Sequence, residues 1–234
     1  MLSIIIPTLN EEKFLPVLLK SIKKQRFMND IEIIVADADS KDKTREVARS
    51  YGCKIVRGGL PAKGRNEGAK IAKGNLLLFL DADGILPNDF LQKAQREFEQ
   101  RELDIASFCL KPQTTKRLEV FLMNILYNWT VLLAFEKIIP HASSQAILVK
   151  KSIHEKIGGF DEEIKIGEDH IYARRAQKFG RFGVLRSTKI ISSLRRYKKD
   201  SLMKTYLKYI LAETYMLLIG GVKKDFFEYK FAHY

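Results

Sequence analysis

Two pairs of acidic residues in this sequence have the spacing of a divalent-cation site. Asp37 and Asp39 directly follow one apolar run, and Asp81 and Asp83 follow another. Carboxylate oxygens are ligands that Mg²⁺ and Mn²⁺ prefer, and carboxylates that share a site need a cation or hydrogen-bond donors to offset their repulsion. The spacing therefore favours metal chemistry. An isolated Asp-x-Asp is also typical of a plain polar turn, so the surrounding elements have to decide between the two.

The elements that carry these acids alternate between strands and helices. The sequence predicts strands over residues 2–6, 31–36, 54–56, 76–80 and 104–108, with amphipathic helices between them. Such alternation predicts an α/β fold with βαβ units and a mostly parallel sheet, whose strands end at one common edge. All four acids are therefore expected to converge on that edge around a bound metal.

Two common phosphate-binding loops are missing from the sequence. A dinucleotide-binding fold would carry Gly-x-Gly-x-x-Gly after its first strand, where this chain has Pro7-Thr8-Leu9-Asn10, and no Walker loop occurs either. Phosphate groups would therefore be held chiefly by a metal and by side chains. Lys63, Arg65 and Asn66, at the start of a predicted helix, are candidates, although a solvated helix start explains them equally well.

The composition describes a basic globular protein. The 234 residues, 46% of them apolar, suffice for one large domain or for one domain with an appendage. The net charge is +13, and +8 of it comes from residues 181–234, where twelve Lys and Arg stand against four Asp and Glu. This asymmetry indicates an anionic partner such as phosphate or lipid headgroups, or else a merely solvated face. Two cysteines without metal spacing, and a first strand without a basic leader, indicate a cytoplasmic protein.

Two apolar segments in the second half of the chain are candidates for contact with a membrane. The segment 118–139 approaches the length of a membrane-spanning helix but is interrupted by Glu119, Asn124, Asn128 and Glu136. It is expected either to be a core helix that also lines a substrate groove or to contact a membrane. The segment 202–222 carries charges at a spacing that favours an amphipathic helix lying on a surface.

A basic cluster over residues 195–199 stands just before the second of these segments. Beside an amphipathic helix such a cluster indicates contact with anionic lipid. No nucleic-acid recognition motif accompanies the basic residues, so no nucleic-acid partner is expected.

Five motifs together resemble the family 2 glycosyltransferases of the GT-A fold, over roughly residues 2–196. They are Ile5-Ile6-Pro7-Thr8-Leu9-Asn10-Glu11, the segment 35–44, Asp81-Ala82-Asp83, Gly158-Gly159-Phe160-Asp161-Glu162 and Gly167-Glu168-Asp169. The second motif departs from the usual Asp-Asp-Gly-Ser or Asp-Gly-Gly-Ser, because Ala38 and Asp39 replace its middle. The resemblance implies a GT-A domain over residues 1–196, followed by a basic amphipathic helical tail over 197–234 that contacts a membrane surface or another subunit.

The resemblance also implies roles for individual residues. Asp37 would bind the nucleotide base or ribose, Asp83 would ligate Mn²⁺ or Mg²⁺, and Asp169 would be the catalytic base. The expected substrate-binding residues are Pro7, Thr8, Asn10, Glu11, Asp37, Lys63, Arg65, Asn66, Asp81, Ala82, Glu168, Arg195 and Arg196.

The expected reaction is inverting transfer of a hexose from a UDP- or GDP-linked donor to a lipid-linked or saccharide acceptor. A carboxylate opposite the leaving diphosphate can take the acceptor proton during attack, whereas a lipid phosphate is already ionised, so that Asp169 would then only orient it. The expected setting is the cytoplasm, with peripheral contact at the inner face of an anionic membrane. The alternatives are a non-catalytic nucleotide-sugar-binding module and a basic membrane-surface protein of the same fold.

Overall fold

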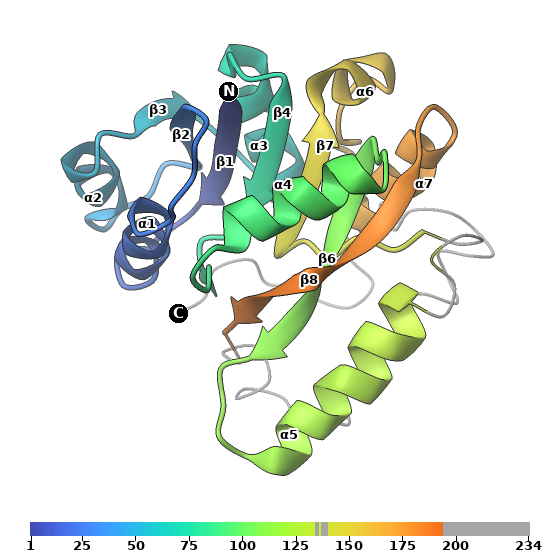
Figure 1. Ribbon diagram of the computed structural model, residues 1–234. Helices are drawn as coiled ribbons and strands as arrows, with labels where there is room; N and C mark the ends of the chain where they lie inside the picture. Colours follow the sequence, from blue (N-terminus) through green and yellow to red (C-terminus); the bar gives the residue numbers. More distant parts are fainter. Residues whose placement is uncertain (134–135, 137–139, 194–234) are drawn as a thin grey trace.

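An eight-stranded mixed sheet with helices on both faces organises the chain (Figure 1). The structure is a computed structural model that describes residues 1–133, 136 and 140–193. The predicted tail over 197–234, with Arg195 and Arg196 before it, lies outside the described residues. The strands, in the spatial order β3-β2-β1-β4-β7-β6-β8-β5, are β1 (Leu2–Thr8), β2 (Ile31–Asp37), β3 (Lys54–Arg57), β4 (Leu76–Leu80), β5 (Gly84–Ile85), β6 (Ile105–Pro112), β7 (Ala146–Lys150) and β8 (Phe182–Ser192).

The helices pack on the two faces of this sheet in two groups. They are α1 (Leu15–Lys23), α2 (Thr44–Ser50), α3 (Pro61–Ile71), α4 (Phe90–Gln100), α5 (Arg117–Leu122), the π-helix η1 (Met123–Leu133), α6 (Lys151–Lys156) and α7 (Glu168–Gln177). Helices α1, α2 and α4 bury their apolar residues in one core, and α3, α6 and α7 bury theirs in the other. Strands β1 and β4 are apolar almost throughout because they are covered on both faces.

The direction of the strands differs in part from the sequence-based expectation. β1, β2, β3 and β4 are parallel, as expected, but β7 runs antiparallel to both β4 and β6. β8 is parallel to β6, with an irregularity in register between Phe108 and Cys109, and β5 pairs antiparallel with β8. The sheet is therefore mixed. A buried run such as 146–149 carries no alternation of polar and apolar residues, so its direction cannot be read from its pattern.

The close approach of α3 to the sheet depends on a glycine. A Cβ atom at Gly68 would lie 2.4 Å from Cγ2 of Ile5 on β1, far inside van der Waals contact. At Gly64 a Cβ would lie 3.0 Å from Cβ of Pro7. The helix therefore lies nearer to β1 than any side chain at Gly68 would allow, and this brings Arg65 and Asn66 beneath the carboxyl edge of the sheet.

The apolar segment that begins at residue 118 forms α5 and η1 and is anchored to the sheet by polar side chains. Asn128, which is 3% exposed, pairs with both backbone groups of Leu110 on β6, at 2.8 Å each. Glu136 accepts hydrogen bonds from the Val184 N–H at 2.8 Å and from Arg101 Nη2 at 2.7 Å. Within the described ranges, none of the helices combines the length and the hydropathy that crossing a bilayer requires.

Candidate active site

Asp37 joins the carboxyl ends of β1 and β2. Its buried carboxylate accepts hydrogen bonds from Thr8 Oγ1 at 3.1 Å and from Ser40 Oγ at 2.5 Å. The Ser40 N–H donates to the other carboxylate oxygen at 3.0 Å, and Arg45 Nε lies 3.7 Å away. These partners hold the Asp37 side chain in one place at the edge where parallel α/β sheets bind ligands.

The loops that follow β1 and β2 are joined into one wall by short polar contacts. Asn10, in the left-handed region with φ of 55°, donates its N–H to Ser40 Oγ at 2.9 Å and accepts from the Lys41 N–H at 2.8 Å. The Glu11 N–H donates to Thr44 Oγ1 at 2.8 Å. Hydrogen bonds between the two loops therefore hold the wall together.

Asp81 and Asp83 stand at the end of β4 and share one amide group. Gln145 Nε2 lies 3.3 Å from Asp81 Oδ2 and 3.2 Å from Asp83 Oδ1. Because β7 is antiparallel to β4, Gln145 at the start of β7 reaches the end of β4, where its carbonyl accepts from the Asp81 N–H at 3.3 Å. Ala82 and Asp83 are buried, so the turn that presents the two carboxylates is packed.

Arg65 on α3 bridges Asp81 to the start of α7. Its guanidinium is 1% exposed, with Nη2 3.0 Å from Asp81 Oδ1 and Nη1 2.8 Å from Glu168 Oε1. The group also lies over the Phe160 ring, 5.2 Å from the ring centroid. Burial and the Asp169 carboxylate raise the pKa of Glu168, and the positive charge of Arg65 partly offsets that rise.

Asn66 holds the turn that precedes α7. Its Oδ1 accepts from the Phe160 N–H at 2.8 Å, and its Nδ2 donates to the Phe160 carbonyl and to Glu162 Oε1, both at 2.9 Å. Gly159 has φ of +74°, and a Cβ there would lie 2.6 Å from Asn66 Oδ1. A glycine is therefore required beside Asn66, and α3 positions this turn as well as Asp81.

Asp169 lies in the first turn of α7, beside two histidines. It is 8% exposed, and its Oδ1 accepts from the His170 N–H at 2.9 Å and lies 3.8 Å from His170 Nε2. The His170 ring packs edge-on against His141, with centroids 5.0 Å apart, and Arg174 Nη2 lies 3.3 Å from His141 Nε2. Asp169 is thus a largely buried carboxylate bordered by the His170 and His141 rings.

The structure separates the four acids that were expected to surround one metal. Asp39 has φ of 65°, its side chain is 65% exposed, and it pairs with Lys41 at 2.6 Å. Asp37 is engaged by Thr8 and Ser40. Among the described residues, no group of three or more His, Cys, Asp or Glu is arranged to hold a metal. The prediction that all four acids surround one metal was wrong, because the left-handed backbone at Asp39 directs its side chain to solvent.

The three residues predicted to hold phosphate have different surroundings. Arg65 and Asn66 are buried and engaged by protein groups. Lys63 is exposed and forms no ion pair within the ranges that the structure describes. Of the three, Lys63 alone therefore presents its cation to solvent.

Sequence reasoning missed Gln145 and the role of Ser40. Gln145 precedes an apolar run, and only a strand running antiparallel to β4 brings that position to the acidic edge. The role of Ser40 could have been found, since an Asp side chain in a turn commonly accepts hydrogen bonds from the chain that follows it.

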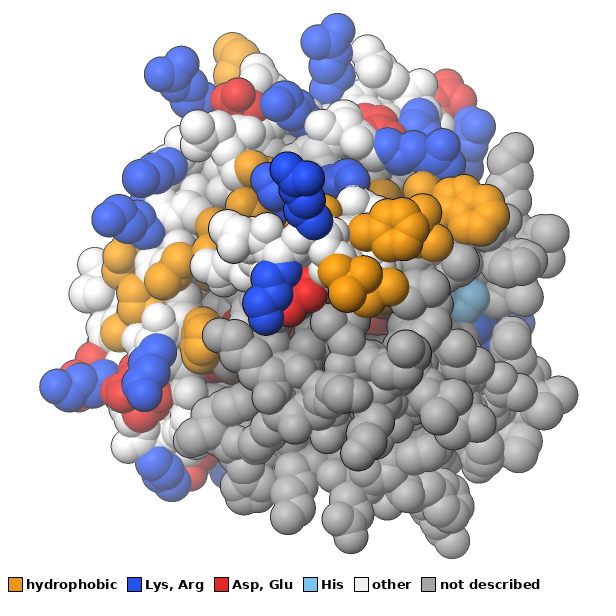
Figure 2. Space-filling model, turned by 90° about the horizontal axis from the view of Figure 1, so that it is seen from below, with side chains coloured by type: hydrophobic (Ala, Val, Ile, Leu, Met, Phe, Trp, Pro, Cys, Tyr) orange, Lys and Arg blue, Asp and Glu red, His pale blue; other side chains and the backbone are white. Residues whose placement is uncertain are grey.

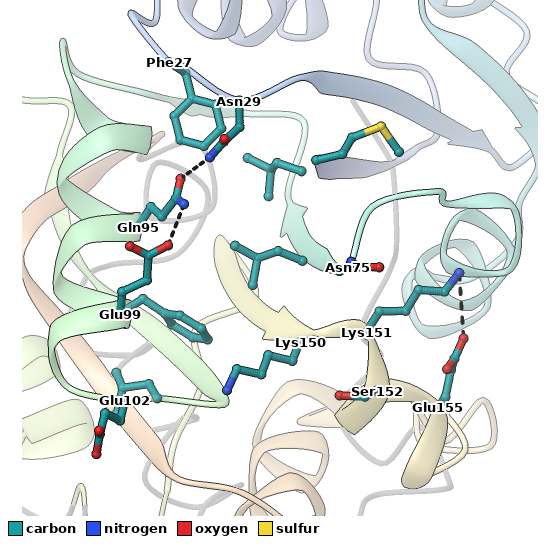
Figure 3. Close-up of a pocket in the computed structure, with 15 residues that line it drawn as sticks. Phe27, Asn29, Asn75, Gln95, Glu99, Glu102, Lys150, Lys151, Ser152 and Glu155 are labelled. Carbon is teal, nitrogen blue, oxygen red and sulfur yellow. Dashed lines mark hydrogen bonds and ion pairs between the residues drawn. The ribbon is translucent and has the colours of Figure 1, made fainter.

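A cavity in the described part of the chain lies away from these residues. Its volume is about 1010 Å³, and it opens at the amino ends of β1 and β4, as Figure 3 shows. One wall is a hydrogen-bonded row of Asn29, Gln95 and Glu99, and the other carries Lys151 and Glu155, 3.7 Å apart. The candidate active site is at the opposite edge of the sheet.

Comparisons with known proteins agree with this geometry. The family model described as "Glycosyl transferase family 2" matches residues 3–158. Poly(ribitol-phosphate) beta-N-acetylglucosaminyltransferase TarS of Staphylococcus aureus is 30% identical in an alignment of 193 residues that covers 74% of this chain and 32% of TarS. An uncharacterized glycosyltransferase of Haemophilus influenzae is 30% identical in an alignment of 186 residues that covers 73% of this chain and 60% of that protein. The chain thus spans only part of each relative, about a third of TarS.

Solved structures share the fold. S. aureus TarS 1–349 in complex with UDP has a TM-score of 0.68 and 24% identity, over 90% of this chain and 65% of that one. The mannosyltransferase PcManGT of Pyrobaculum calidifontis, in complex with GDP-Man and Mn²⁺, has a TM-score of 0.72 and 21% identity, over 95% and 65%. The expected GT-A fold is confirmed, and with two thirds of its residues matched by the family model (3–158 of 234) the chain belongs to glycosyl transferase family 2.

Proposed function

We propose that this chain transfers a hexose from a UDP- or GDP-linked donor to a lipid-linked or saccharide acceptor, with inversion at the anomeric carbon and dependence on Mn²⁺ or Mg²⁺. The observation that carries the proposal is the juxtaposition of two features at one edge of the sheet: the hydrogen-bonded wall around Asp37, and the bridged pair Asp81 and Asp83 beside it. The wall around Asp37 offers a hydrogen-bond acceptor for a nucleoside, and Asp81 and Asp83 offer carboxylates for a metal that would hold a diphosphate.

The nucleoside would lie against the wall formed by the loops after β1 and β2. Pro7, Thr8, Asn10 and Glu11 line this wall, and Asp37 would accept hydrogen bonds from the base or ribose. The solved complexes of TarS with UDP and of PcManGT with GDP-Man, which share the fold, support a nucleotide-sugar as the donor.

The donor set at the end of β4 fits a hard divalent cation. Asp81 and Asp83 supply carboxylate oxygens, and the buried Gln145 Oε1 has no hydrogen-bond partner among the described residues. If the Gln145 side-chain amide were flipped about χ3, its Oε1 would face the cation in place of Nε2. Asp83 would be the protein's principal ligand, and a metal bound there supplies Lewis-acid stabilisation of the leaving diphosphate.

The acceptor hydroxyl would attack from the side of Asp169. As the new bond from the acceptor oxygen to the anomeric carbon forms, the bond from that carbon to the diphosphate breaks, and Asp169 takes the hydroxyl proton. Glu168 and Arg65 hold the start of α7 in place for this step. With a phosphate as acceptor no proton is removed, and Asp169 orients the nucleophile instead.

The site is proposed to work in the cytoplasm at the inner face of a membrane. The positive net charge of +13 supports contact with anionic lipid, and the proposed tail over 197–234, with Arg195 and Arg196 before it, contributes much of that charge. The competing function is a nucleotide-sugar-binding module without turnover, which shares every donor contact but does not use Asp169.

Donor binding is tested by titration calorimetry with UDP and with GDP, with and without Mn²⁺. We expect Mn²⁺ to raise the affinity of the wild type for its nucleotide at least tenfold, and Asp83→Asn to abolish this gain. Asp30→Asn, an exposed carboxylate at the opposite edge of the sheet, is the matched control and should behave as wild type. A wild-type affinity that ignores Mn²⁺ refutes metal dependence.

Turnover is tested by release of UDP or GDP from a panel of nucleotide-sugars. Asp169→Asn should keep donor affinity but lose on the order of a hundredfold or more in rate, the usual contribution of a general base. A rate near that of wild type would remove Asp169 from the role of base. Tight donor binding without turnover by the wild type would support the binding module.

A further inference from the structure

A stripe of large apolar side chains on α5 and η1 faces away from the sheet. Leu118 is 68% exposed, Phe121 60%, Ile125 42% and Trp129 60%, at a spacing of three to four residues. Met123 and Asn128 on the same segment are buried, and Asn128 is hydrogen-bonded to Leu110 on β6. The apolar stripe Leu118–Phe121–Ile125–Trp129 is therefore an outward face of a helix that is anchored on its inner side.

This apolar stripe lies at the same edge of the sheet as the candidate active site. β6 is antiparallel to β7, which is antiparallel to β4, so β6 and β4 end at the same edge. The helix α5 begins just after β6 ends, and Figure 1 shows it extending beyond that edge. A flat surface that meets the apolar stripe would therefore approach the molecule from the side of Asp81 and Asp83.

Cationic side chains lie near the apolar stripe, where Lys116 pairs with Glu119 and Lys189 contacts Asn124. The exposed residues Lys111, Lys116, Arg117 and Lys189 come from the end of β6, from the start of α5 and from β8. Figure 2, which views the molecule from below, shows Lys and Arg side chains around the hydrophobic side chains on this face. The nearest acid on the helix is Glu119, whose side chain is only 21% exposed and lies 3.4 Å from Lys116.

We propose that the apolar stripe inserts into the surface of an anionic bilayer, with the four cations on the lipid phosphates. Aromatic and aliphatic side chains on one face, edged by Lys and Arg, are what a helix lying in the headgroup region requires, and Trp prefers that depth. The surrounding charge selects anionic over neutral lipid. A soluble acidic protein would pair with the cations, but it would not bury the exposed Trp129 and Phe121 side chains.

The contact rests on the proposed function in one respect, since it would bring a lipid-linked acceptor to the edge that holds the donor. Vesicle binding is nevertheless measured without nucleotide, so its failure is distinguishable from failure of the transferase. A protein that binds vesicles but no nucleotide refutes the proposed function alone. A protein that binds nucleotide but no vesicles refutes the membrane contact alone.

The test uses the full chain and vesicles of phosphatidylcholine with or without 30% phosphatidylglycerol, at about 0.1 M salt. Trp129 is the only tryptophan, so its emission reports on the apolar stripe directly. Anionic vesicles should shift this emission to the blue, and brominated lipid should quench it. Neutral vesicles should bind at least tenfold more weakly.

Matched variants decide whether the apolar stripe itself makes the contact. The double variant Leu118→Ser with Phe121→Ser should lower affinity for anionic vesicles at least tenfold. The control variant Met28→Ser with Phe179→Ser removes two exposed apolar side chains elsewhere, 97% and 49% exposed, and should retain the affinity. Nucleotide affinity should be unchanged in both, which verifies that they fold.

Three results would overturn the proposal. The first is vesicle binding without a change in Trp129 emission, which would assign the contact to another surface. The second is equal binding by the two double variants. The third is a stripe variant that dissociates a dimer while wild type ignores vesicles, which would make a second copy of the chain the partner.

Discussion

Arg65 is the residue on which the candidate site converges. It is buried beneath the sheet edge and contacts Asp81, Glu168 and the Phe160 ring. Taking one cation and two carboxylates out of water is costly, and their attraction recovers that cost only while all partners are present. The same guanidinium therefore ties the acidic turn after β4 to the start of α7, two segments that would otherwise repel.

Replacing Arg65 by Met should lower the free energy of unfolding by about 3–5 kcal/mol, because it leaves the carboxylates of Asp81 and Glu168, whose side chains are 15% and 10% exposed, without the Arg65 cation. Urea denaturation at neutral pH measures the change. Lys63→Ala on the same helix is the control, and as an exposed substitution it should change stability by less than about 0.5 kcal/mol. Equal losses in the two variants would contradict the bridging role.

At the scale of elements, the site depends on how closely α3 lies to β1 and on the direction of β7. The first is set by Gly68, where the helix has no side chain to hold it off Ile5. The second places Gln145 beside Asp81 and Asp83. The close approach of α3 and the direction of β7 take no part in the chemistry, but they determine the positions of the acidic turn after β4 and of the carboxylates on α7.

Gly68→Ala should destabilise the protein by about 1–3 kcal/mol, because a methyl group 2.4 Å from Ile5 Cγ2 overpacks the core. Helix propensity alone would give the opposite sign, a gain of up to about 1 kcal/mol, so the sign identifies the cause. Thermal and urea unfolding measure it, with Lys70→Ala as an exposed control. Combining Gly68→Ala with Ile5→Ala should cost less than the sum of the single changes, and strict additivity would argue against the clash.

The sequence predicted the parallel half of the sheet well. Strands 2–6, 31–36 and 76–80 match β1, β2 and β4 because each is a continuous apolar run closed by polar residues. The antiparallel direction of β7 was not predicted. The strand β8 was not predicted either, because the exposed Arg186, Ser187 and Lys189 interrupt its apolar pattern. Asp81 and Asp83 were found from adjacency to a strand, whereas Gln145 reaches them only through tertiary pairing. The local sequence pattern identifies the residues in and next to a strand, but it does not identify which distant strand pairs with that strand.

At the scale of the whole molecule, the two cores differ in their sensitivity to acid. The core beneath α3, α6 and α7 contains His154, which is 7% exposed and bonded through Nδ1 to the Tyr172 hydroxyl at 2.9 Å. Phe79 and Phe160 pack around it. Burial, with Lys151 and Arg175 nearby, lowers the pKa of His154 from 6.5 to about 4. This histidine is therefore neutral in the folded protein at pH values where the unfolded chain binds a proton.

Global stability should consequently fall as pH drops from about 6.5 towards 4, because the unfolded state gains a proton that the folded state does not. The shift corresponds to roughly 3 kcal/mol once pH reaches the folded pKa. His154→Phe should lose this component, so its deficit relative to wild type shrinks between pH 7 and pH 4.5 in urea titrations. Tyr172→Phe removes the same hydrogen bond but keeps the imidazole, and should retain the wild-type slope. Parallel pH profiles for wild type and His154→Phe would contradict the assignment.

The pairing of β4 with β7 has a consequence for biogenesis. Asp81 and its bridging partner Gln145 stand 64 positions apart, and the intervening chain must be synthesised before the amide can reach the acids. Contacts of such separation form late and slowly. A nascent chain that has emerged only as far as β6 already contains Asp37, Asp81 and Asp83 but lacks Gln145 and the carboxylates of α7, so the candidate site is completed only after β7 and α7 have been synthesised.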